Sequence, residues 1–358
     1  LYLTFDDVDR EFWTLFCALI DFQIPVARVL NPMLWGLASW IEEKGFKFIH
    51  LIEDENIAKE VLKSFRWGEG RIGFVHRFVK MSDLMLLFKI FDRMIKEYGS
   101  LRSIVEEAYE RARYEDEPME QVLSSLVNVF KRCGGRPPLV PVKFSSTLKR
   151  LNLFFRWMVR PYPDLGLWSF MDKRHLLASL DEGLKRVLSR AFLLRVNLNW
   201  SGVLRTTKFL RTINPDDPVK YDYVLSRISI MGYCAKDISK SKCYLCPLMN
   251  TCKATELRPE PRSKALKGRE GEILERFLKT YRGEFDRVIT EYPLGNYSAD
   301  VLLHKPSCET YVVEVEEELN YNAIGQALVY RYLYFKLHQK LAKPVIICSK
   351  SRKELEEV

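Results

Sequence analysis

Apolar side chains recur at three- and four-residue spacing through most of the first 255 residues of the chain, which is typical of amphipathic helices. Residues 68–73 and 134–141 interrupt the pattern with glycine and proline and are predicted to be loops. Ser146 and Thr147 are expected to cap a helix. The clearest predicted helices cover residues 9–22, 32–45, 83–99, 148–160 and 177–194.

The pattern changes after residues 256–269, which are rich in proline and charge and are predicted to form a basic linker. Beyond it, alternating and continuous apolar runs predict strands between helices. The expected order is a helix over 271–283, strands over 287–294, 297–304 and 310–316, a helix over 322–342, a strand over 344–349 and a short terminal helix. The predicted fold class is therefore multidomain, with an all-α domain over 1–255 and a small α/β domain with a central mixed sheet over 270–358.

Composition narrows the function further. The length of 358 residues exceeds what one hydrophobic core usually serves, in agreement with two domains. The formal net charge of +9 favours an anionic partner. No apolar run is long enough to cross a membrane and no segment has the pattern of a secretory signal, so we expect no membrane partner and a cytoplasmic protein. The sequence does not indicate an oligomeric state.

Four cysteines lie close together with the spacing C-x8-C-x2-C-x5-C: Cys234, Cys243, Cys246 and Cys252. Four thiolates so close in sequence can bind one metal centre, and they suit an iron–sulfur cluster or a structural zinc. Disulfides are a third interpretation. Zinc ribbons usually have two C-x2-C pairs and this loop has one, which favours a 4Fe–4S cluster over zinc. The remaining cysteines are scattered and are expected to be small core residues: Cys17, Cys133, Cys308 and Cys348.

Three carboxylates stand on two neighbouring predicted strands of the C-terminal part. Asp300 opens the apolar run of the second strand, and Glu314 and Glu316 alternate with apolar residues on the third. Residues two apart on a strand project from the same face. Carboxylates grouped in this way suit Mg²⁺ or Mn²⁺, so a divalent metal site is predicted.

The segments before the cysteines resemble a family of DNA-repair enzymes. In chain order they are STLKRLNLFFRWMVR, LASLDEGLKRVLSR and YVLSRISIMGYC. This order resembles the helix-hairpin-helix DNA glycosylase superfamily, whose endonuclease III members end in a four-cysteine iron–sulfur loop. In that resemblance Asp181 matches the catalytic aspartate of an L-D-T-H motif, and Lys149 matches the lysine that forms a Schiff base. A lysine that attacks the sugar forms an imine, and a carboxylate stabilises the positive charge that develops.

Two departures from the family change the expectation. The hairpin glycines before the lysine are replaced by VKFSST, so the clamp on a DNA phosphate is expected to be altered. Glu182 and Gly183 stand where the family has Thr-His.

Lys149 precedes Asp181 by 32 residues, a spacing similar to that of archaeal 8-oxoguanine glycosylases. The string KRLNLFFRWMVR is similar to a motif of an uncharacterised bacterial and archaeal family, so a prokaryotic, nucleoid-associated protein is implied.

Such an enzyme extrudes the target base into a pocket, where aromatic side chains stack on it. Trp67 and Phe144 are the aromatic candidates for this pocket, and Gln23 is a candidate for reading a base edge. An aromatic residue at helical spacing is more often part of a core, and that alternative stays open for both.

The C-terminal carboxylates resemble the metal site of PD-(D/E)xK restriction-endonuclease-like nucleases. That resemblance assigns Asp300 and Glu314 as metal ligands, with support from Gln326 and Tyr330 on the following helix. Glu272 resembles the glutamate that archaeal Holliday-junction resolvases carry on their first helix. Glu316 stands where the motif has lysine, which departs from the family but occurs in some active restriction enzymes.

The predicted function is a DNA-repair enzyme: a base-excision glycosylase and AP lyase, with 8-oxoguanine as the leading lesion, joined to an Mg²⁺- or Mn²⁺-dependent endonuclease. One alternative is a lesion- or structure-specific endonuclease whose glycosylase-like domain only recognises DNA. Another is a DNA-binding protein without catalysis in either domain. All three have damaged or structured duplex DNA as their partner.

Overall fold

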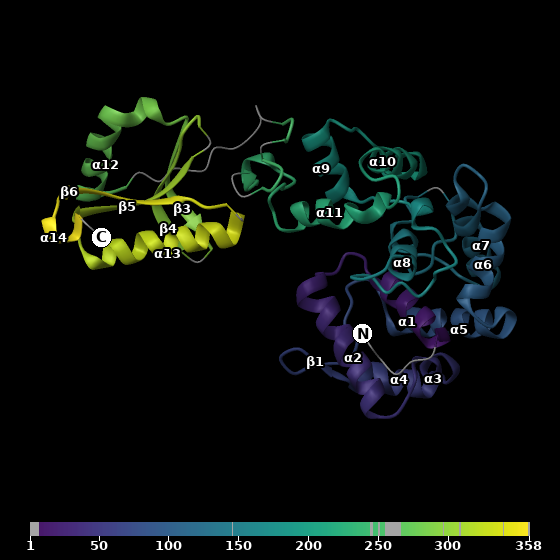
Figure 1. Ribbon diagram of the computed structural model, residues 1–358. Coiled ribbons are helices and arrows are strands. Elements are labelled where there is room, and N and C mark those ends of the chain that lie inside the picture. The colour runs from purple at the N-terminus through teal and green to yellow at the C-terminus, as the bar shows by residue number, and fades with distance from the viewer. Residues whose placement is uncertain are drawn as a thin grey trace. The chain divides into compact units, whose positions relative to one another are not determined.

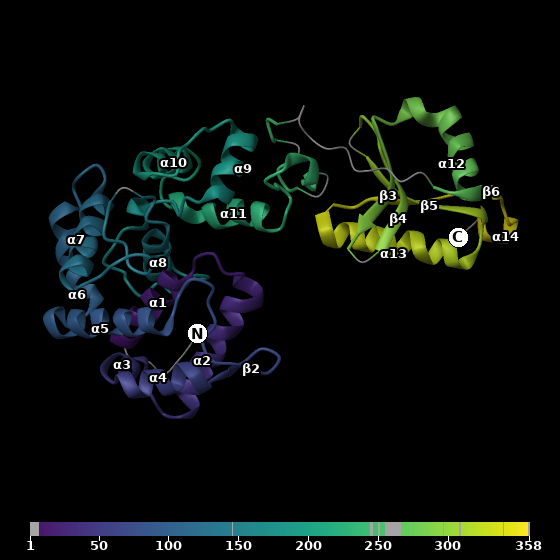
Figure 2. The same cartoon turned by 180° about the vertical axis from the view of Figure 1, so that it is seen from behind.

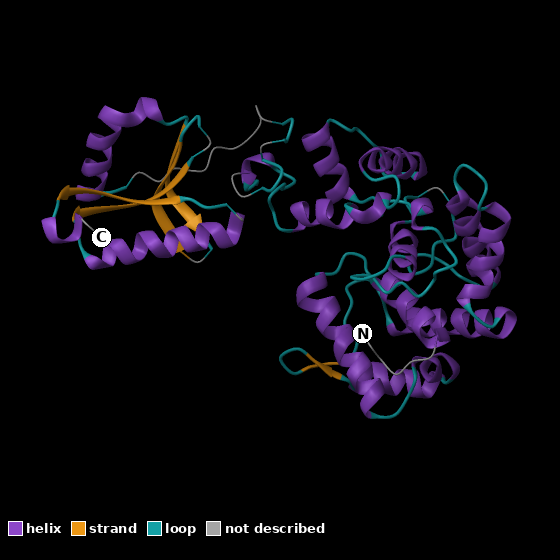
Figure 3. Cartoon of the chain, viewed as in Figure 1, coloured by secondary structure: helices purple, strands orange, loops and turns teal. Residues whose placement is uncertain are grey.

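The computed structural model describes residues 7–144, 146–243, 246–249, 251–254, 266–295, 297–307, 309–338 and 340–356. Most of its helices precede the main sheet along the chain, and the rest accompany the sheet, so the predicted order of a helical part and a small α/β part is confirmed (Figure 3). Most of the predicted linker, and Cys308, lie outside the described residues.

The described residues form two compact units. The helical unit runs to Arg227, without Arg190–Phe192, and the C-terminal unit comprises Arg190–Phe192 and the chain from Ile228 onward. The four cysteines therefore group with the C-terminal unit. None of the helices in the described ranges is long and apolar enough to span a membrane.

The helical unit is built around α1, whose side chains are buried on nearly all sides. Helix α1 packs against α3, α6 and α8 (Figure 1). Its Phe16 forms an aromatic core with Phe48 and Phe88, and its buried Phe12 contacts Phe91. The helices are α1 (Asp7–Ile20), α2 (Asn31–Glu43), α3 (Phe48–Glu53), α4 (Glu55–Ser64), α5 (Met81–Tyr98), α6 (Leu101–Ala112), α7 (Pro118–Arg132), α8 (Lys149–Val159), α9 (Glu182–Phe192), α10 (Trp200–Ile213) and α11 (Asp222–Ile230), with a π-helical turn at Val26–Leu30 and 3₁₀ turns at Lys173–His175 and Pro218–Lys220.

Three local predictions in this unit need correction. Helix α9 begins at Glu182 instead of residue 177, because the buried segment 177–180 is extended and Asp181 caps the helix. Helix α8 is preceded by Leu148 in the left-handed conformation (φ 46°), so Ser146 and Thr147 are not its cap. The loop predicted at 68–73 is a turn over 68–70, at glycines with positive φ, but Arg71–Ile72 form strand β2, which pairs with β1 (Arg66–Trp67) in a hairpin.

The C-terminal unit has a four-stranded mixed sheet, as predicted. The strand order is β3-β4-β5-β6, with antiparallel pairs except for the parallel pair β5–β6. Its elements are a 3₁₀ turn at Ile238–Lys240, α12 (Gly268–Tyr281), a 3₁₀ turn at Arg282–Glu284, β3 (Arg287–Leu294), β4 (Tyr297–His304), β5 (Thr310–Glu318), α13 (Tyr321–His338), β6 (Lys343–Lys350) and α14 (Lys353–Glu356).

Two helices cover opposite faces of this sheet, and the same two layers are seen from behind in Figure 2. Helix α12 contributes Ile273 and Leu274 to one core, together with Val313 and Val315 of β5. Helix α13 contributes Tyr330 and Tyr334 to the other core. The alternation of side chains along β5 therefore sends apolar residues into both layers.

Candidate active sites

The structure brings together the lysine and the aspartate that the sequence singled out. Lys149 is the first residue of α8 and Asp181 immediately precedes α9. The Lys149 Nζ lies 3.1 Å from Asp181 Oδ2, with the two side chains 35% and 30% exposed. The other oxygen, Asp181 Oδ1, accepts a hydrogen bond from Leu184 N at 2.8 Å and so caps α9. The pair is therefore half-buried, reachable from solvent and fixed at the ends of two helices.

Asn152, one turn into α8, holds the segments before the two residues together. Its Nδ2 donates to Thr147 O at 3.1 Å and to Ala178 O at 3.5 Å. The side chain is buried, so both bonds are shielded from water. Asn152 thus fixes the spacing between Lys149 and Asp181, a role that the sequence analysis did not assign to it.

Two arginines of the KRLNLFFRWMVR string form buried ion pairs that hold α8 against neighbouring segments. Arg156 Nη1 lies 2.6 Å from Asp222 Oδ1, and Asp222 Oδ2 accepts from Ser179 N at 3.2 Å. Arg160 Nε donates to Asp217 Oδ1 at 2.9 Å. A buried arginine needs such partners, since breaking a buried pair typically costs about 3–5 kcal/mol. The string therefore anchors the extended segment that leads to Asp181.

A second carboxylate, Asp21, lies near the pair and was missed in the sequence. Burial raises the pKa of Asp21, and the charges of Lys149, Asp181 and Arg150 act on it as well. Arg150 ties this end of α1 to α8, since its Nη1 donates to Leu19 O at 2.6 Å. Burial also lowers the pKa of Arg150 to about 10. No local sequence pattern predicts Asp21 as a site residue, because it lies near Lys149 only through the packing of α1 against α8.

The three predicted base-pocket residues have different surroundings. Gln23 is exposed, has φ 49° and follows Phe22, whose ring lies 4.8 Å from the Arg150 guanidinium carbon. Trp67 is only 4% exposed, and its Nε1 donates to Gly73 O at 2.8 Å inside its own hairpin. Trp67 is thus placed as a core residue of the hairpin.

Phe144 packs edge-on against Trp200, with ring centroids 4.4 Å apart. The buried Nε1 of Trp200 has no hydrogen-bond partner in the described part of the chain. A buried indole N–H normally finds a partner, so an unsatisfied one beside a half-buried phenylalanine marks a place for an acceptor. Trp200 was not predicted from the sequence.

The cysteine loop joins the end of α9. Arg190 Nη1 donates to Cys234 Sγ at 3.4 Å and to Ala235 O at 2.6 Å, and Cys252 Sγ lies 3.7 Å from Arg190 O. Cys246 N donates to Cys243 O at 3.0 Å, which closes a tight turn between these two cysteines. Burial raises the pKa of the Cys246 thiol, and the other three cysteines raise it further. The other three thiols therefore lie within electrostatic reach of Cys246.

The donor set fits the predicted cofactor. In the described part of the loop the four cysteines are thiols and form no disulfide. Over the described residues, no three or more His, Cys, Asp or Glu side chains are already positioned to coordinate a metal ion. In kind, four sulfur ligands suit either a cluster or zinc.

The predicted acidic centre forms between β4 and β5. Asp300 Oδ2 accepts from Val315 N at 2.7 Å, which fixes that carboxylate on the edge of the next strand. Glu314 is hydrogen-bonded to Asp300, and burial together with Asp300 raises the pKa of Glu314 to about 8. Glu316 lies within electrostatic range of both. The three carboxylates that the sequence grouped are thus brought together.

Glu314 is the most informative member of the centre. It is 4% exposed, and its Oε2 has no hydrogen-bond partner among the described residues. Tyr330 of α13 is hydrogen-bonded to Glu314 and to Gln326, and burial raises the pKa of Tyr330. A buried carboxylate oxygen without a partner is costly unless a proton or a cation satisfies it. The predicted support from Tyr330 and Gln326 is thus in contact with the site.

Two further glutamates approach this centre, and neither was singled out in the sequence. Burial raises the pKa of Glu270 of α12, and Asp300, Glu316 and Glu291 raise it further. Glu291 of β3 also raises the pKa of Asp300. On α12 it is therefore Glu270 that interacts with the carboxylates, and both Glu270 and the predicted Glu272, which projects at a different angle of the helix, are exposed.

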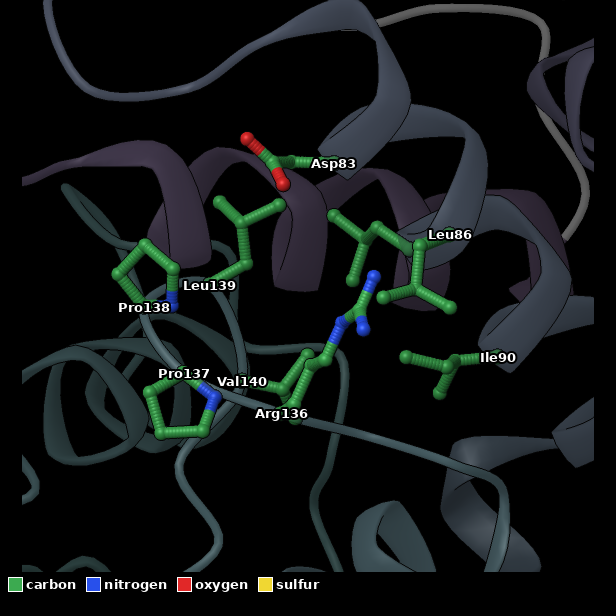
Figure 4. A pocket seen from close by; sticks show the side chains of 9 residues that line it. Asp83, Leu86, Ile90, Arg136, Pro137, Pro138, Leu139 and Val140 are labelled. Carbon is green, nitrogen blue, oxygen red and sulfur yellow. The ribbon is translucent and has the colours of Figure 1, made fainter.

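A small pocket lies apart from these sites, between α5 and residues 136–140 (Figure 4). Its lining includes Asp83, Leu86, Ile90 and Arg136. Asp83 already accepts from Lys80 N at 2.8 Å, where it caps α5. Because the pocket is lined by none of the candidate residues, we assign no chemistry to it.

Sequence comparison places the helical part in a known family. The chain belongs to the family described as "Protein of unknown function (DUF2400)", whose model matches residues 3–231. The match includes Lys149 and Asp181 and ends before Cys234. No curated protein and no solved structure matches the chain.

Proposed function

We propose that this chain is a DNA-repair enzyme with two activities. The helical unit, with the loop of four cysteines, would be a helix-hairpin-helix DNA glycosylase and AP lyase. The C-terminal unit would carry a restriction-endonuclease-like, metal-dependent nuclease. The observation that supports the first activity is the ion pair of 3.1 Å between Lys149 and Asp181 at the starts of two helices. The resemblance of the surrounding motifs to glycosylases connects that pair to DNA.

Lys149 acts as the nucleophile in this mechanism. Its Nζ attacks C1′ of the damaged nucleoside, and the base leaves with the electron pair of the N-glycosidic bond and takes up a proton. Asp181 stabilises the positive charge on the sugar and accepts the proton that the amine loses. A proton transferred to the ring oxygen opens the sugar and leaves an imine on Lys149. Loss of a C2′ proton then breaks the C3′–O bond and releases the 3′ phosphate, and water hydrolyses the imine to free the lysine. Asn152 keeps the two groups at reacting distance throughout.

The extruded base would lie near Phe144 and Trp200, since a stacked ring and an unsatisfied donor suit a flipped base. The net charge of +9 supports a polyanionic partner. The cysteine loop would hold a 4Fe–4S cluster that stabilises the chain, with zinc as the alternative. Oxidised guanine remains the leading lesion, by resemblance alone.

A nuclease activity has its own supporting observation, which is the unpartnered Oε2 of buried Glu314. Asp300 and Glu314 would hold Mg²⁺ or Mn²⁺, which activates a water and polarises the phosphate when bound. Val315 N and Tyr330 orient these two carboxylates. Glu316 replaces the lysine of the motif, so the positive charge that lysine provides must have another source.

The two activities are tested by one panel of lesion-bearing and branched duplexes, incubated with EDTA and separately with Mn²⁺. We expect base release and strand scission with EDTA, lost in Lys149→Ala and retained in Lys96→Ala, a control on the exposed surface of α5. We expect metal-dependent cleavage to be lost in Asp300→Asn and retained in Lys149→Ala. The absence of all EDTA-resistant products would refute the glycosylase. The absence of metal-dependent products would refute the nuclease, and binding alone would leave a DNA-binding protein.

A further inference from the structure

Helix α13 has apolar side chains on all its sides, although only one side packs on the sheet (Figure 1). Its inner side contributes four buried residues: Ala323, Ala327, Tyr330 and Tyr334. The opposite side is exposed and forms the outer face of α13, whose members are Tyr321, Gly325, Leu328, Val329, Tyr332 and Phe335. A helix that is apolar on every side is normally buried on every side. The outer face is therefore expected to have a partner.

The outer face has the spacing by which helices pair. Tyr321, Gly325, Leu328, Tyr332 and Phe335 follow one another at steps of four, three, four and three residues. This is the alternation of the a and d positions in a coiled coil, which places all five on one stripe. The four buried residues of α13 fall at the c and f positions of the same repeat, on the far side of the helix. One side of α13 thus packs on its own sheet, and the other has the pattern of a helix-pairing surface.

Gly325 lies on this stripe, although the fold of the unit does not require a glycine there. It is inside α13, and a Cβ added to it would meet no atom of the described residues within 4 Å. A glycine inside a helix is destabilising relative to alanine, because it loses more backbone freedom on folding. Glycine also lets another surface approach the backbone closely. The open space above Gly325 can therefore receive a side chain from outside the unit.

A second copy of α13 is complementary to the outer face when the two helices run antiparallel. The a positions of one copy then pack against the d positions of the other. Phe335 packs over Gly325 of the second copy, so a large side chain faces the residue that has none. Tyr332 packs against Leu328 of the second copy, and Val329 lies beside its own equivalent on the two-fold axis. Each contact is made twice, as an isologous interface requires.

The charges beside the stripe favour the antiparallel arrangement over the parallel one. The sequence of α13 has no acidic residue, and Arg331 and Lys336 flank the stripe at g and e positions. In a parallel pair, g positions face e positions, so Arg331 and Lys336 of opposite copies would repel each other at two places. In the antiparallel pair Lys336 faces Asn322 of the second copy. One like-charge contact remains, between the two Arg331 side chains, at the edge of the interface where solvent screens it.

The outer face is large enough for a stable dimer. Its side chains other than Gly325 are between 41% and 77% exposed. With about 200 Å² for a whole aromatic side chain, Tyr321, Tyr332 and Phe335 expose about 350 Å² together. Leu328 and Val329 raise the exposed apolar area to about 500 Å². An interface of standard size buries about 800 Å² per partner, and about 65% of a homodimer interface is apolar. The outer face thus has the apolar area that one partner of such a dimer contributes.

We propose that the outer face of α13 is a homodimer interface, in which two copies of the helix pack antiparallel with Phe335 of each over Gly325 of the other. Leu328 and Val329 at its centre are aliphatic, which suits a protein partner better than stacked bases. This inference is independent of the proposed glycosylase and nuclease, because the interface contains none of their candidate residues.

The test is the mass of the full chain in solution, measured by sedimentation velocity over a series of protein concentrations. We expect a concentration-dependent dimer in the wild type. Leu328→Glu should raise the dissociation constant about 100-fold or more, because it buries an unpaired charge at the centre of the interface. Val224→Glu, the same kind of change at an exposed aliphatic residue of α11, is the matched control and should leave the dimer unchanged. Circular dichroism should show both variants folded, since both positions are exposed in the single chain.

Substitution of Gly325 tests the pairing itself. Gly325→Phe should weaken the dimer about tenfold or more, because the added ring competes with Phe335 of the second copy. Its own chain has room for the Cβ, so the variant should remain folded. The double variant G325F/F335A exchanges the large and the small residue, and we expect it to recover most of the lost affinity.

A wild-type chain that stays monomeric at every concentration, or a dimer that Leu328→Glu leaves intact, would overturn the interface. A monomeric wild type whose binding of single-stranded DNA is lost in Leu328→Glu would also overturn it, and would make nucleic acid the occupant of this face. A dimer that Leu328→Glu dissociates, but that G325F/F335A fails to restore relative to Gly325→Phe, would refute the antiparallel pairing.

Discussion

Asp181 has two roles that substitution can separate. One oxygen caps α9 through Leu184 N at 2.8 Å, and the other lies 3.1 Å from Lys149 Nζ. Asp181→Ala removes both interactions, whereas Asp181→Asn keeps a capping oxygen and loses the charge. Loss of an N-cap costs about 1 kcal/mol. Loss of an ion pair with side chains one-third exposed costs about 0.2–1 kcal/mol.

We therefore expect Asp181→Ala to lower the free energy of unfolding by about 1–2 kcal/mol, and Asp181→Asn by less than about 1 kcal/mol. For a unit of this size a difference of about 1 kcal/mol between the variants corresponds to about 2–4 °C in Tm, measured by circular dichroism. Both variants should lose about 100-fold or more in single-turnover base release, because each lacks the carboxylate. The proposed mechanism thus separates stability from activity.

Equal Tm values for the two variants would show that Asp181 does not cap α9 in solution. Wild-type base release by Asp181→Asn would show that its charge is not needed for catalysis. Either result refutes one of the two roles without touching the other.

Three further predictions concern the other groups. Asn152→Ala loses two buried hydrogen bonds, so urea unfolding should show a loss of about 1–3 kcal/mol and kcat should fall more than KM rises; an unchanged kcat would contradict its positioning role. Cys246→Ser should abolish the broad visible absorbance and bound iron expected of an iron–sulfur protein, while Cys133→Ser keeps both; a colourless wild type with stoichiometric zinc would contradict the cluster. Mn²⁺ affinity should increase about tenfold per pH unit up to about pH 8, because burial and Asp300 raise the pKa of Glu314 to about 8 and its proton competes with the metal; calorimetry that finds no pH dependence would contradict this.

The helices and strands were largely predictable because their apolar periodicity is strong. The start of α9 was not, since the apolar residues at 177–180 fit a helix pattern as well as the buried extended segment that they form. Asp181 itself carried the missing signal, because aspartate before an amphipathic run is a preferred N-cap. Periodicity therefore predicted the helix, and capping chemistry decides where it begins.

The acidic centre likewise includes residues that periodicity predicts and one whose choice depends on packing. Asp300, Glu314 and Glu316 follow from strand alternation, but the choice between Glu270 and Glu272 depends on which face of α12 packs on the sheet. Ile273 and Leu274 are the buried residues of α12, and positions three and four before them share their face. Glu270 could therefore have been predicted from the sequence.

Other members of the sites depend on tertiary structure. Asp21 reaches Lys149 only because α1 packs against α8. The left-handed backbone of Glu291 is not indicated by its residue type, since glycine and asparagine are the usual occupants of that conformation. Trp200 comes beside Phe144 through folding of segments far apart in the sequence. Such contacts between distant segments carry no local sequence pattern.

The central claim is that Lys149 is a nucleophile toward damaged DNA. The most direct measurement is borohydride reduction of the wild-type chain with a panel of lesion-bearing duplexes in EDTA, followed by proteolysis and mass spectrometry of the trapped peptide. We expect a reduced sugar adduct on Lys149 that Lys96→Ala keeps and Lys149→Ala lacks. An adduct on another residue, or no adduct with any lesion, would contradict it.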